Sequence, residues 1–467
     1  MVDRVTNRPK VPLAQQAIFQ RTPIIMPPLT KPAKPVVGSG TKDPRDLVPI
    51  GGSGVGQRTT GLDVRLGGAR EVTESSFGPS FEASLDQHTA SRARAGCTTK
   101  LLFDGVQSFK ERNALIDDAK SSIHLQTFIF TDDDAGWDTA RRLAAKARAG
   151  VEVRVIVDAF GSQRSDPKLF EMMRAAGVDV RSHETGLIGA NKRWHEKHLI
   201  LDGKVSIEGG MNIADEYALG GSGLQILSKY KRGKIPWRDV DVKIEGAAVH
   251  DAQRAFLRNW KQLGGAVPDV ARLFPRPAFN PRGAEVRVVQ HHPAEGEDHT
   301  LQLYLHAVKA ATKSITIENA YFIPPKELRD ALIAAARRGV EVRVLTNSKE
   351  SGNHGYCVDA ARYWYDEMLS AGAKIFERTH VSTLHSKTAA FDGKYSIVGS
   401  ANMNGRSVGL DSEVSVAVRD EATAAELAAR FLSGLAEARA VTLAEVRNDS
   451  FVTNVRKWVF ASLSWTL

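Results

Sequence analysis

The amino-acid sequence predicts a duplicated α/β protein, in which each half is built around a largely parallel or mixed β-sheet. First, apolar strands alternate with helical segments from about residue 100, as in "VEVRVIVDAFGS" (151–162) and "KLFEMMRAAGV" (168–178). This alternation is typical of βαβ units. Second, the series recurs, because "ALIAAARRGVEVRVLTN" (331–347) matches "RLAAKARAGVEVRVIVD" (142–158). Third, a cluster of histidine, lysine and aspartate occurs twice, at equivalent positions of the repeat.

The remaining elements follow the same order in both halves. "SSIHLQTFIF" (121–130) has the composition of a strand, and "KSITIENAYFI" (313–323) repeats it. "DTARRLAAKARAG" (138–150) has a helical pattern that ends at Gly150, a residue suited to a helix C-terminus. "MLSAGAKIFERTH" (368–380) also matches "MMRAAGVDVRSHE" (172–184). We therefore predict an arm (1–95), a first domain (96–265), a linker (266–283), a second domain (284–440) and a C-terminal helical tail (441–467).

The predicted arm differs in composition from the rest of the chain. It holds ten of the 19 prolines and shows no hydrophobic periodicity, which is typical of a disordered or loosely ordered segment. Its "GGSGVG" (51–56) resembles a phosphate-binding loop. We interpret it as a linker, because no convincing strand precedes it and no helix follows.

Composition narrows the possible functions. The formal net charge of +9 favours anionic partners such as phosphate esters, nucleic acid or lipid surfaces. The only two cysteines, Cys97 and Cys357, exclude a disulfide framework and a cysteine-rich zinc site. The first twenty residues lack the apolar run of a standard secretory signal, and no stretch approaches the ~18 apolar residues of a membrane span. We expect a soluble or peripheral protein.

The candidate site is the doubled cluster, which has the pattern H-x-K-x4-D followed by G-G/S-x-N in each half. Its members are His195, Lys197, Asp202, Gly209, Gly210 and Asn212 in the first half and His385, Lys387, Asp392, Gly399, Ser400 and Asn402 in the second. A single H-x-K-x4-D pattern is a weak signal. Two copies at equivalent positions, each with the same glycine-x-asparagine tail, indicate a function.

Strand geometry suggests how the cluster is arranged. "HEKHLILD" (195–202) and "HSKTAAFD" (385–392) have the pattern of strands, so the histidine and lysine of each motif share a face. Asp202 and Asp392 have the opposite parity, and we expect them to support the fold. The "DGK" sequence at each aspartate predicts a tight turn. The following strand then returns the glycines and asparagines of the motif toward the histidine end.

A histidine beside a cation suits the cleavage of a phosphodiester. One imidazole attacks phosphorus to give a phosphohistidine, and the other protonates the leaving oxygen and then activates water or an alcohol. The lysines hold the non-bridging oxygens and stabilise negative charge. This scheme needs two histidines, which the duplication supplies, and it predicts no metal and no cofactor.

With these motifs the chain resembles the phospholipase D superfamily, and most closely its bacterial cardiolipin synthase-like branch. The resemblance covers about residues 100–440. Its most specific motifs are "GGMNIADEY" (209–217), "PWRDVDVKIEGAAV" (236–249), "AYFIPP" (320–325) and "GSANMNGRSVGLDSEV" (399–414). It implies fused α/β/α sandwich domains packed as a pseudo-two-fold pair, with one active site at their interface.

The resemblance also implies roles for individual residues. An acidic residue after each motif orients a histidine, and Asp239 and Glu413 occupy these positions. His195 is expected to be the nucleophile and His385 the acid and base. The implied substrate is a glycerophospholipid, with water as acceptor giving phosphatidic acid, and an alcohol such as phosphatidylglycerol giving transfer.

Several other residues have both a structural and a functional interpretation. His198 is expected to pack in the core, and so are His291 and His292, for which substrate contact is the less favoured alternative. His354 and Tyr356 follow a strand end, where α/β proteins bind ligands, and we predict that they contact the substrate.

Two segments have a comparable ambiguity. The basic run "KYKRGK" (229–234) fits lipid headgroups, nucleic acid or a solvated loop. The segment "NVRKWVFASLSWTL" (454–467) fits an interfacial membrane helix, although a helix packed on the second domain is the favoured interpretation.

Related cardiolipin synthases usually begin with apolar membrane helices, which this sequence lacks. We therefore expect a monomer in the cytoplasm or at a peripheral membrane surface, with secretion by a route without a standard signal as a further option. The alternatives are a nuclease of the same superfamily, a silent member that only docks on anionic membranes, and a secreted phospholipase effector. Nucleic acid is the less favoured substrate, because such nucleases are usually short and carry one motif.

Overall fold

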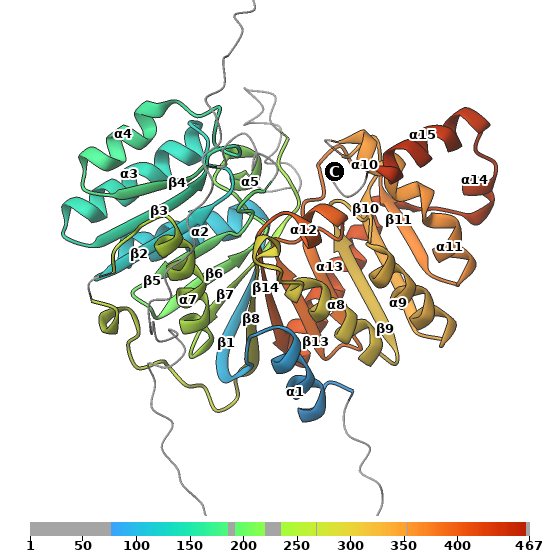
Figure 1. Ribbon diagram of the computed structural model, residues 1–467, viewed down its shortest axis with the longest axis horizontal. Coiled ribbons are helices and arrows are strands. Elements are labelled where there is room, and N and C mark those ends of the chain that lie inside the picture. The colour runs from blue at the N-terminus through green and yellow to red at the C-terminus, as the bar shows by residue number, and fades with distance from the viewer. Residues whose placement is uncertain (1–75, 185–191, 220–234, 268, 353, 464–467) are drawn as a thin grey trace, which may run out of the picture. The chain divides into compact units, whose positions relative to one another are not determined.

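The computed structural model describes residues 76–184, 192–219, 235–267, 269–352 and 354–463 (Figure 1). Most of the predicted arm, with "GGSGVG" (51–56), lies outside the described residues. The basic run 229–234 and the last four residues of the tail lie outside them as well.

The first half contains seven strands and five of the described helices. The strands are β1 (Arg94–Phe103), β2 (Ser122–Thr127), β3 (Glu152–Asp158), β4 (Asp179–His183), β5 (His198–Leu201), β6 (Val205–Gly209) and β7 (Val240–Glu245). The helices are α2 (Asp104–Asp118), α3 (Asp134–Arg148), α4 (Pro167–Ala175), α5 (Asp215–Ala218) and α7 (Ala248–Gln262). A short 3-10 helix, η4 (Ala271–Leu273), lies in the segment predicted as the linker.

The second half repeats this series and extends it. Its strands are β8 (Ala284–His291), β9 (Ser314–Asn319), β10 (Glu341–Asn347), β11 (Lys374–Arg378), β12 (Lys387–Phe391), β13 (Tyr395–Gly399), β14 (Glu413–Arg419) and β15 (Ala438–Ala440). Its helices are η5 (Pro293–Glu295), α8 (His299–Ala310), α9 (Lys326–Arg337), α10 (Gly355–Tyr363), α11 (Tyr365–Ser370), α12 (Gly405–Gly409), α13 (Glu421–Leu435), α14 (Leu443–Arg447) and α15 (Phe451–Ser462).

All fifteen described strands form one sheet whose order shows the duplication. The order is β15-β11-β10-β9-β12-β13-β14-β8-β1-β7-β6-β5-β2-β3-β4. Outward from the β1–β8 pair, the two halves match strand by strand, and β15 is an addition at one edge. Strands β2, β3 and β4 are parallel, as are β9, β10 and β11, while the inner strands pair antiparallel. The predicted duplicated α/β fold with mixed sheets is confirmed.

Helices cover both faces of the sheet. Figure 1 shows α7 and α8 in front of the strands and α2 and α13 behind them, so equivalent helices of the two halves lie on opposite faces. A continuous buried cluster crosses the β1–β8 pair and includes Val242 and Phe256 from the first half with Val286 and Val416 from the second. The halves therefore share one hydrophobic core at the centre, which fixes their relative position.

The folded part of the chain begins earlier than the sequence predicted. Helix α1 (Pro79–His88) lies within the predicted arm and packs on α8. Phe77 and Leu85 are buried in the core of the second half, and the Phe77 ring stacks on Tyr395 with centroids 5.2 Å apart. The predicted boundary at residue 95 is wrong for this segment, in which Phe77, Phe81 and Leu85 recur at a helical spacing of four residues.

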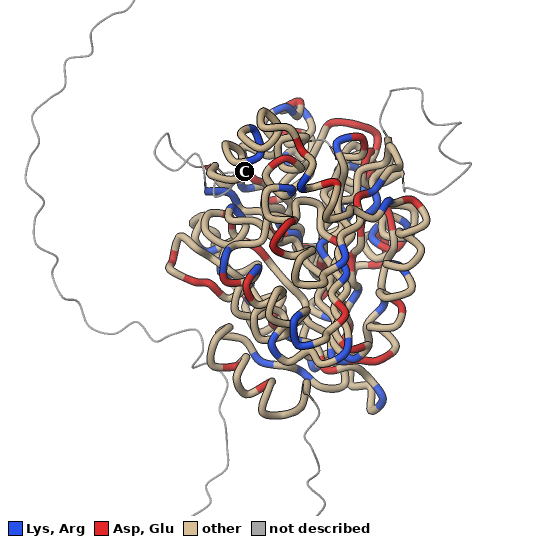
Figure 2. The backbone as a smooth tube through the Cα atoms, turned by 90° about the vertical axis from the view of Figure 1, so that its right-hand side faces the viewer, with Lys and Arg blue, Asp and Glu red and all other residues tan. Residues whose placement is uncertain are grey.

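On the side that Figure 2 shows, positive and negative residues are mixed, and lysine and arginine alternate with aspartate and glutamate. Of the helices described, none is long and apolar enough to cross a membrane.

Candidate active site

The two motifs meet where the segments that precede β5 and β12 lie beside those that precede β14 and β7, and backbone hydrogen bonds join the halves there. The N–H of His195, just before β5, donates to the carbonyl of Ser412 at 2.9 Å. The N–H of His385, just before β12, donates to the carbonyl of Arg238 at 2.7 Å. Each motif therefore starts beside a segment that belongs to the other half of the chain.

Each histidine is held by a carboxylate from the other half. His195 Nδ1 lies 3.0 and 3.1 Å from the two carboxylate oxygens of Glu413. His385 Nδ1 lies 2.7 Å from Asp239 Oδ2. If each Nδ1–H donates to its carboxylate, Nε2 is the nitrogen left for chemistry. The sequence named both carboxylates, whereas this exchange between the halves appears only in the structure.

Each motif lysine is buried and bonded to its own histidine. Lys197 Nζ donates to the His195 carbonyl at 2.5 Å, and Lys387 Nζ donates to the His385 carbonyl. Burial lowers the pKa of Lys197 to about 8 and that of Lys387 to about 7, although nearby carboxylates oppose the shift. Two ammonium groups are thus placed beside the histidines with little water to screen them.

Aromatic side chains restrict access to the imidazoles. The edge of Phe128 lies against His195, with centroids 5.0 Å apart. Tyr217 and Trp237 flank His385 at 5.2 and 5.0 Å. The His195 side chain is 12% exposed and the His385 side chain 6%. These side chains limit the entry of bulk water.

The electrostatics of the site favour neutral imidazoles in the free protein. Burial, followed by the charges of Lys197 and Lys387, lowers the pKa of both histidines well below 6.5. Burial also raises the pKa of Asp239 to about 6 and raises that of Glu413. A neutral imidazole is the form that can attack phosphorus.

The glycine and serine positions of the motifs accommodate the two carboxylates. A Cβ atom on Gly210 would lie 2.3 Å from Asp239 Oδ1, so any larger residue there would have to displace the carboxylate. At the equivalent position Ser400 Oγ donates to Glu413 Oε2 at 2.5 Å. Gly209 and Gly399 sit against neighbouring strands, where a Cβ would come within 2.3 Å of Asp241 Oδ1 or 2.5 Å of the Val414 carbonyl.

The motif aspartates lie at the opposite end of the hairpins from the histidines. Asp202 occupies the β5–β6 turn with φ +55° and accepts hydrogen bonds from the backbone N–H groups of residues 120–122 at 2.7–3.1 Å. Asp392 occupies the β12–β13 turn with φ +54° and accepts from residues 312–314 at 2.7–2.9 Å. Both side chains tie the turn to the start of the neighbouring strand.

The two motif asparagines have different surroundings. Asn212 Oδ1 accepts from the Ile129 N–H at 3.0 Å, and its amide donates to the Tyr217 hydroxyl at 2.9 Å. It therefore braces the ring that flanks His385. Asn402 donates its backbone N–H to Ser407 Oγ at 3.1 Å, and its buried Oδ1 has no hydrogen-bond partner among the described residues.

His354 and Tyr356 lie beyond β10, at the start of α10. Their rings are 5.2 Å apart, and His354 is 5.6 Å from the Tyr321 ring. His354 lines a small hollow with Tyr321 and Asn347. The described contacts do not join either residue to the motif histidines.

Two arginines near the site were not singled out from the sequence. The charges of Arg193 and Arg406 contribute to lowering the pKa of His195. The Arg193 guanidinium lies 3.8 Å from the centroid of the Phe160 ring. Arg406 forms a bidentate pair with Asp411 at 2.9 and 3.0 Å. The signal that could have found Arg406 is its place in "GSANMNGRS" (399–407).

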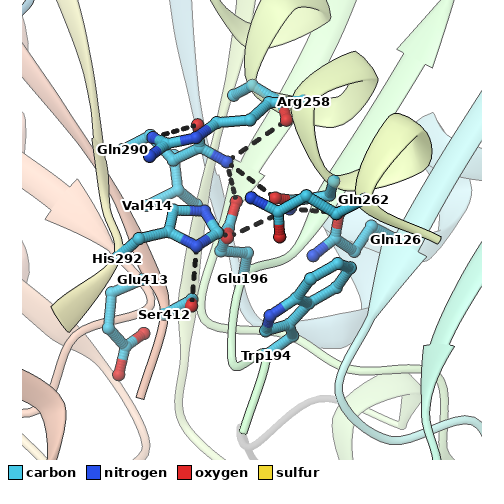
Figure 3. A network of polar contacts seen from close by, with 12 residues as sticks. Gln126, Trp194, Glu196, Arg258, Gln262, Gln290, His292, Ser412, Glu413 and Val414 are labelled. Carbon is cyan, nitrogen blue, oxygen red and sulfur yellow. Dashed lines mark hydrogen bonds and ion pairs between the residues drawn. The ribbon is translucent and has the colours of Figure 1, made fainter. Parts of the chain in front are cut away.

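A buried polar network supports the first motif from behind. His198 lies 2.9 Å from Glu196 and 2.7 Å from Glu208. Figure 3 shows His292 between Glu196 and Ser412, at 3.1 Å from each. Burial lowers the pKa of His198, but the two carboxylates outweigh it and raise the value to about 10.

The remaining histidine and cysteine candidates are structural. His291 is buried and lies 3.0 Å from the Val408 carbonyl. Cys97 and Cys357 are both buried and free. Within the described ranges, no group of three or more histidine, cysteine, aspartate or glutamate residues is placed to hold a metal ion.

Comparison with known proteins identifies the family. A family model described as cardiolipin synthase, PLD-like domain, matches residues 113–219 and 304–434. A cardiolipin synthase of Clostridium perfringens is 30% identical over 381 residues, which cover 78% of this chain and 76% of that protein. A cardiolipin synthase of Listeria monocytogenes serotype 4a is 33% identical over 351 residues, which cover 73% and 70%. The chain belongs to the phospholipase D superfamily.

Within this superfamily it falls in the cardiolipin synthase-like branch, as the motifs predicted. The fold is also that of the phosphatidylserine synthase from Haemophilus influenzae, with a TM-score of 0.65 at 14% identity, covering 83% of this chain and 100% of that one. The prediction of a phospholipase D-type enzyme acting on phospholipids is confirmed.

Proposed function

We propose that this phospholipase D-type enzyme transfers a phosphatidyl group from a glycerophospholipid to an alcohol, through a covalent intermediate on His195. The observation that carries the proposal is the pair of buried imidazoles, each held at Nδ1 by a carboxylate of the other half and each beside a buried ammonium group. One chain supplies both motifs, so a monomer suffices for the reaction.

In the first step, His195 Nε2 attacks phosphorus and the bond to the headgroup oxygen breaks. Nε2–H of His385 gives its proton to that oxygen, so the headgroup leaves as a neutral alcohol. Lys197 and Lys387 bind the non-bridging oxygens. The phosphate anion offsets the lysine charges that lower the pKa of His385, which favours the protonated acid in the bound state.

In the second step, His385 Nε2 takes a proton from the acceptor hydroxyl. The acceptor oxygen attacks phosphorus, and the bond to His195 breaks, which restores both imidazoles. With phosphatidylglycerol as acceptor the product is cardiolipin, and with water it is phosphatidic acid. The low exposure of both histidines favours the alcohol, because little bulk water reaches the intermediate.

The remaining site residues act around this centre. We propose that Asp239 and Glu413 hold the imidazoles in one orientation and that Asn402 donates its amide to a phosphate oxygen. Asn212 positions Tyr217 against His385, and the substrate reaches the site past His354 and Tyr356. Because the substrate resides in a bilayer, the enzyme acts at a membrane surface.

The decisive experiment uses vesicles of phosphatidylglycerol with excess chelator, and measures cardiolipin, phosphatidic acid and released glycerol. We expect cardiolipin and glycerol from the wild type, and neither from His195→Ala or His385→Ala. Plasmid DNA serves as the competing substrate. Cleavage of DNA without lipid turnover, or full activity of either single variant, would contradict the proposal.

A further inference from the structure

Helix α15 carries a row of apolar side chains that face away from the protein. The row, called here the α15 apolar face, consists of Phe451, Val452, Val455, Trp458 and Val459, continued by Leu463 just after the helix. Their exposed fractions run from 40% for Val459 to 82% for Phe451. The spacing of these residues places them on one side of the helix.

The opposite side of α15 is anchored to the second half. Lys457 and Ala461 are buried, and Lys457 pairs with Asp449. Arg456 pairs with Asp359 of α10 at 3.0 Å. A helix that packs on a protein normally buries its apolar side. Helix α15 packs through Lys457, Phe460 and Ala461 and presents most of its apolar side chains outward.

The side of α15 that packs on the protein contacts α10, which begins near the catalytic centre. The Phe460 ring lies 6.1 Å from that of Tyr356, which begins α10 beyond the carboxyl end of β10. The charges of Arg193 and Arg406 act on the pKa of Tyr356 and on that of His195, so both groups lie within electrostatic range of the same cations. Figure 1 shows α15 beside α10, at the end of the second half where α12 also lies.

Other exposed apolar residues occur at the same kind of position. Phe160 follows β3 and is 45% exposed, and Val381 follows β11 and is 56% exposed. Both lie beyond the carboxyl ends of parallel strands, as Tyr356 does. The α15 apolar face is therefore the largest part of a discontinuous apolar rim at this edge.

The charge around the α15 apolar face favours an anionic surface. Lys349 and Arg456, with side chains 39% and 46% exposed, both pair with the one buried carboxylate of Asp359, which leaves an excess of one positive charge there. An outward row of tryptophan, phenylalanine and valine flanked by cations is the pattern of a helix that lies in a bilayer interface.

We propose that the α15 apolar face docks this enzyme on an anionic phospholipid bilayer and holds the entrance of the active site against the membrane. The proposal rests on the proposed function, which places the substrate in a bilayer. It adds that helix α15 is the element that contacts the membrane. The apolar side chains enter the interface while the α10 side of the helix keeps its contacts with the protein.

The test compares Val455→Asp/Trp458→Asp with Leu432→Asp, a matched control on α13 whose leucine is 53% exposed, against 55% for Trp458. Binding is measured by sedimentation with vesicles of phosphatidylglycerol and phosphatidylethanolamine. Turnover is measured on the same vesicles and on dihexanoyl phosphatidylglycerol below its micelle concentration. Thermal unfolding checks that both variants keep the wild-type fold.

We expect the α15 double variant to lose at least about tenfold in vesicle binding and in turnover on vesicles. Its turnover of the monomeric lipid should stay within about twofold of wild type, and Leu432→Asp should match wild type throughout. Wild-type vesicle binding that the double variant retains, or no wild-type binding at all, would overturn the proposal. So would a wild-type dimer that the double variant converts to monomer, because the face would then be an interface between copies.

A failure of the proposed function has a different signature. In that case the wild type turns over neither vesicle nor monomeric phospholipid, whatever its binding to vesicles. Loss of turnover on vesicles alone, with monomeric turnover intact, separates docking from chemistry.

Discussion

The first and second motifs bear the same histidine and lysine in different surroundings. Behind His195 lies a buried network of charged groups, with His198 between Glu196 and Glu208. The equivalent positions in the second half are Ser386, Thr388 and Val398. The two halves therefore share the histidine and lysine of the motif, whereas the side chains that pack behind them differ.

The two carboxylates that contact the histidines, Asp239 and Glu413, also have different neighbours. The shorter Asp239 needs Gly210 beside it, whereas the longer Glu413 accepts a hydrogen bond from Ser400. Each half thus pairs a carboxylate with the one small residue that fits its length. Four sets of substitutions test this difference between the halves.

The largest effect is expected from removing the imidazoles one at a time. His195→Ala and His385→Ala should each lower kcat/KM by about 10⁴-fold or more, since residues that act as a unit fail together. With a substrate labelled at phosphorus and carrying a leaving group that needs no protonation, such as p-nitrophenol, His385→Ala protein denatured at alkaline pH should retain label and His195→Ala should retain none. If the His195→Ala protein retained label instead, His385 would be the nucleophile and His195 the acid and base.

The second effect concerns the charged network of the first half. His198→Thr copies the second half at one position and leaves Glu196 and Glu208 buried without their shared partner, which should cost about 3–5 kcal/mol of unfolding free energy. The triple change Glu196→Ser/His198→Thr/Glu208→Val copies all three positions and should recover more than half of that loss. Urea unfolding measures both, and an equal loss in the two variants would argue against a charge origin.

The pH dependence of unfolding gives an independent reading of the same network. The pKa of His198 is raised to about 10 from 6.5, so its contribution to stability is complete below about pH 6.5 and is lost as the pH rises through about 10. The His198→Thr variant should lack this alkaline decline.

A smaller effect is expected from exchanging the residues beside the carboxylates. Gly210→Ser adds a Cβ atom 2.3 Å from Asp239 Oδ1, which should displace Asp239 from His385 and lower kcat/KM by about 10²-fold. Ser400→Gly removes one hydrogen bond to Glu413 and should lower it by about tenfold or less. Steady-state kinetics on vesicles measures the difference, and equal losses would show that the two carboxylates are supported alike.

The smallest effect is a shift in the pH at which kcat/KM falls on the alkaline side. Because the pKa of Lys197 is about 8 and that of Lys387 about 7, both lose their charge as the pH rises, and kcat/KM of the free enzyme should fall above about pH 7–8. Lys387→Arg should move this fall upward toward pH 8, where Lys197 titrates, since a guanidinium stays charged. An unchanged fall would mean that Lys387 is not the group that titrates.

The duplication, the order of the strands along each half, and the pair of motifs could all be predicted from the sequence. These features are local or periodic, so alternating strands and helices and the repeated H-x-K-x4-D pattern report them directly. The "DGK" pattern also predicted the tight turns in which Asp202 and Asp392 lie.

Only the tertiary structure decided which carboxylate serves which histidine and which segments belong to the core. Glu413 reaches His195, and Asp239 reaches His385, because the β1–β8 pair and the core across it bring the two halves face to face. Helix α1 joins the fold, and α15 turns its apolar side outward, through contacts with distant residues. The sequence does not report the partners in such contacts, because these depend on which surfaces the folded halves present to one another.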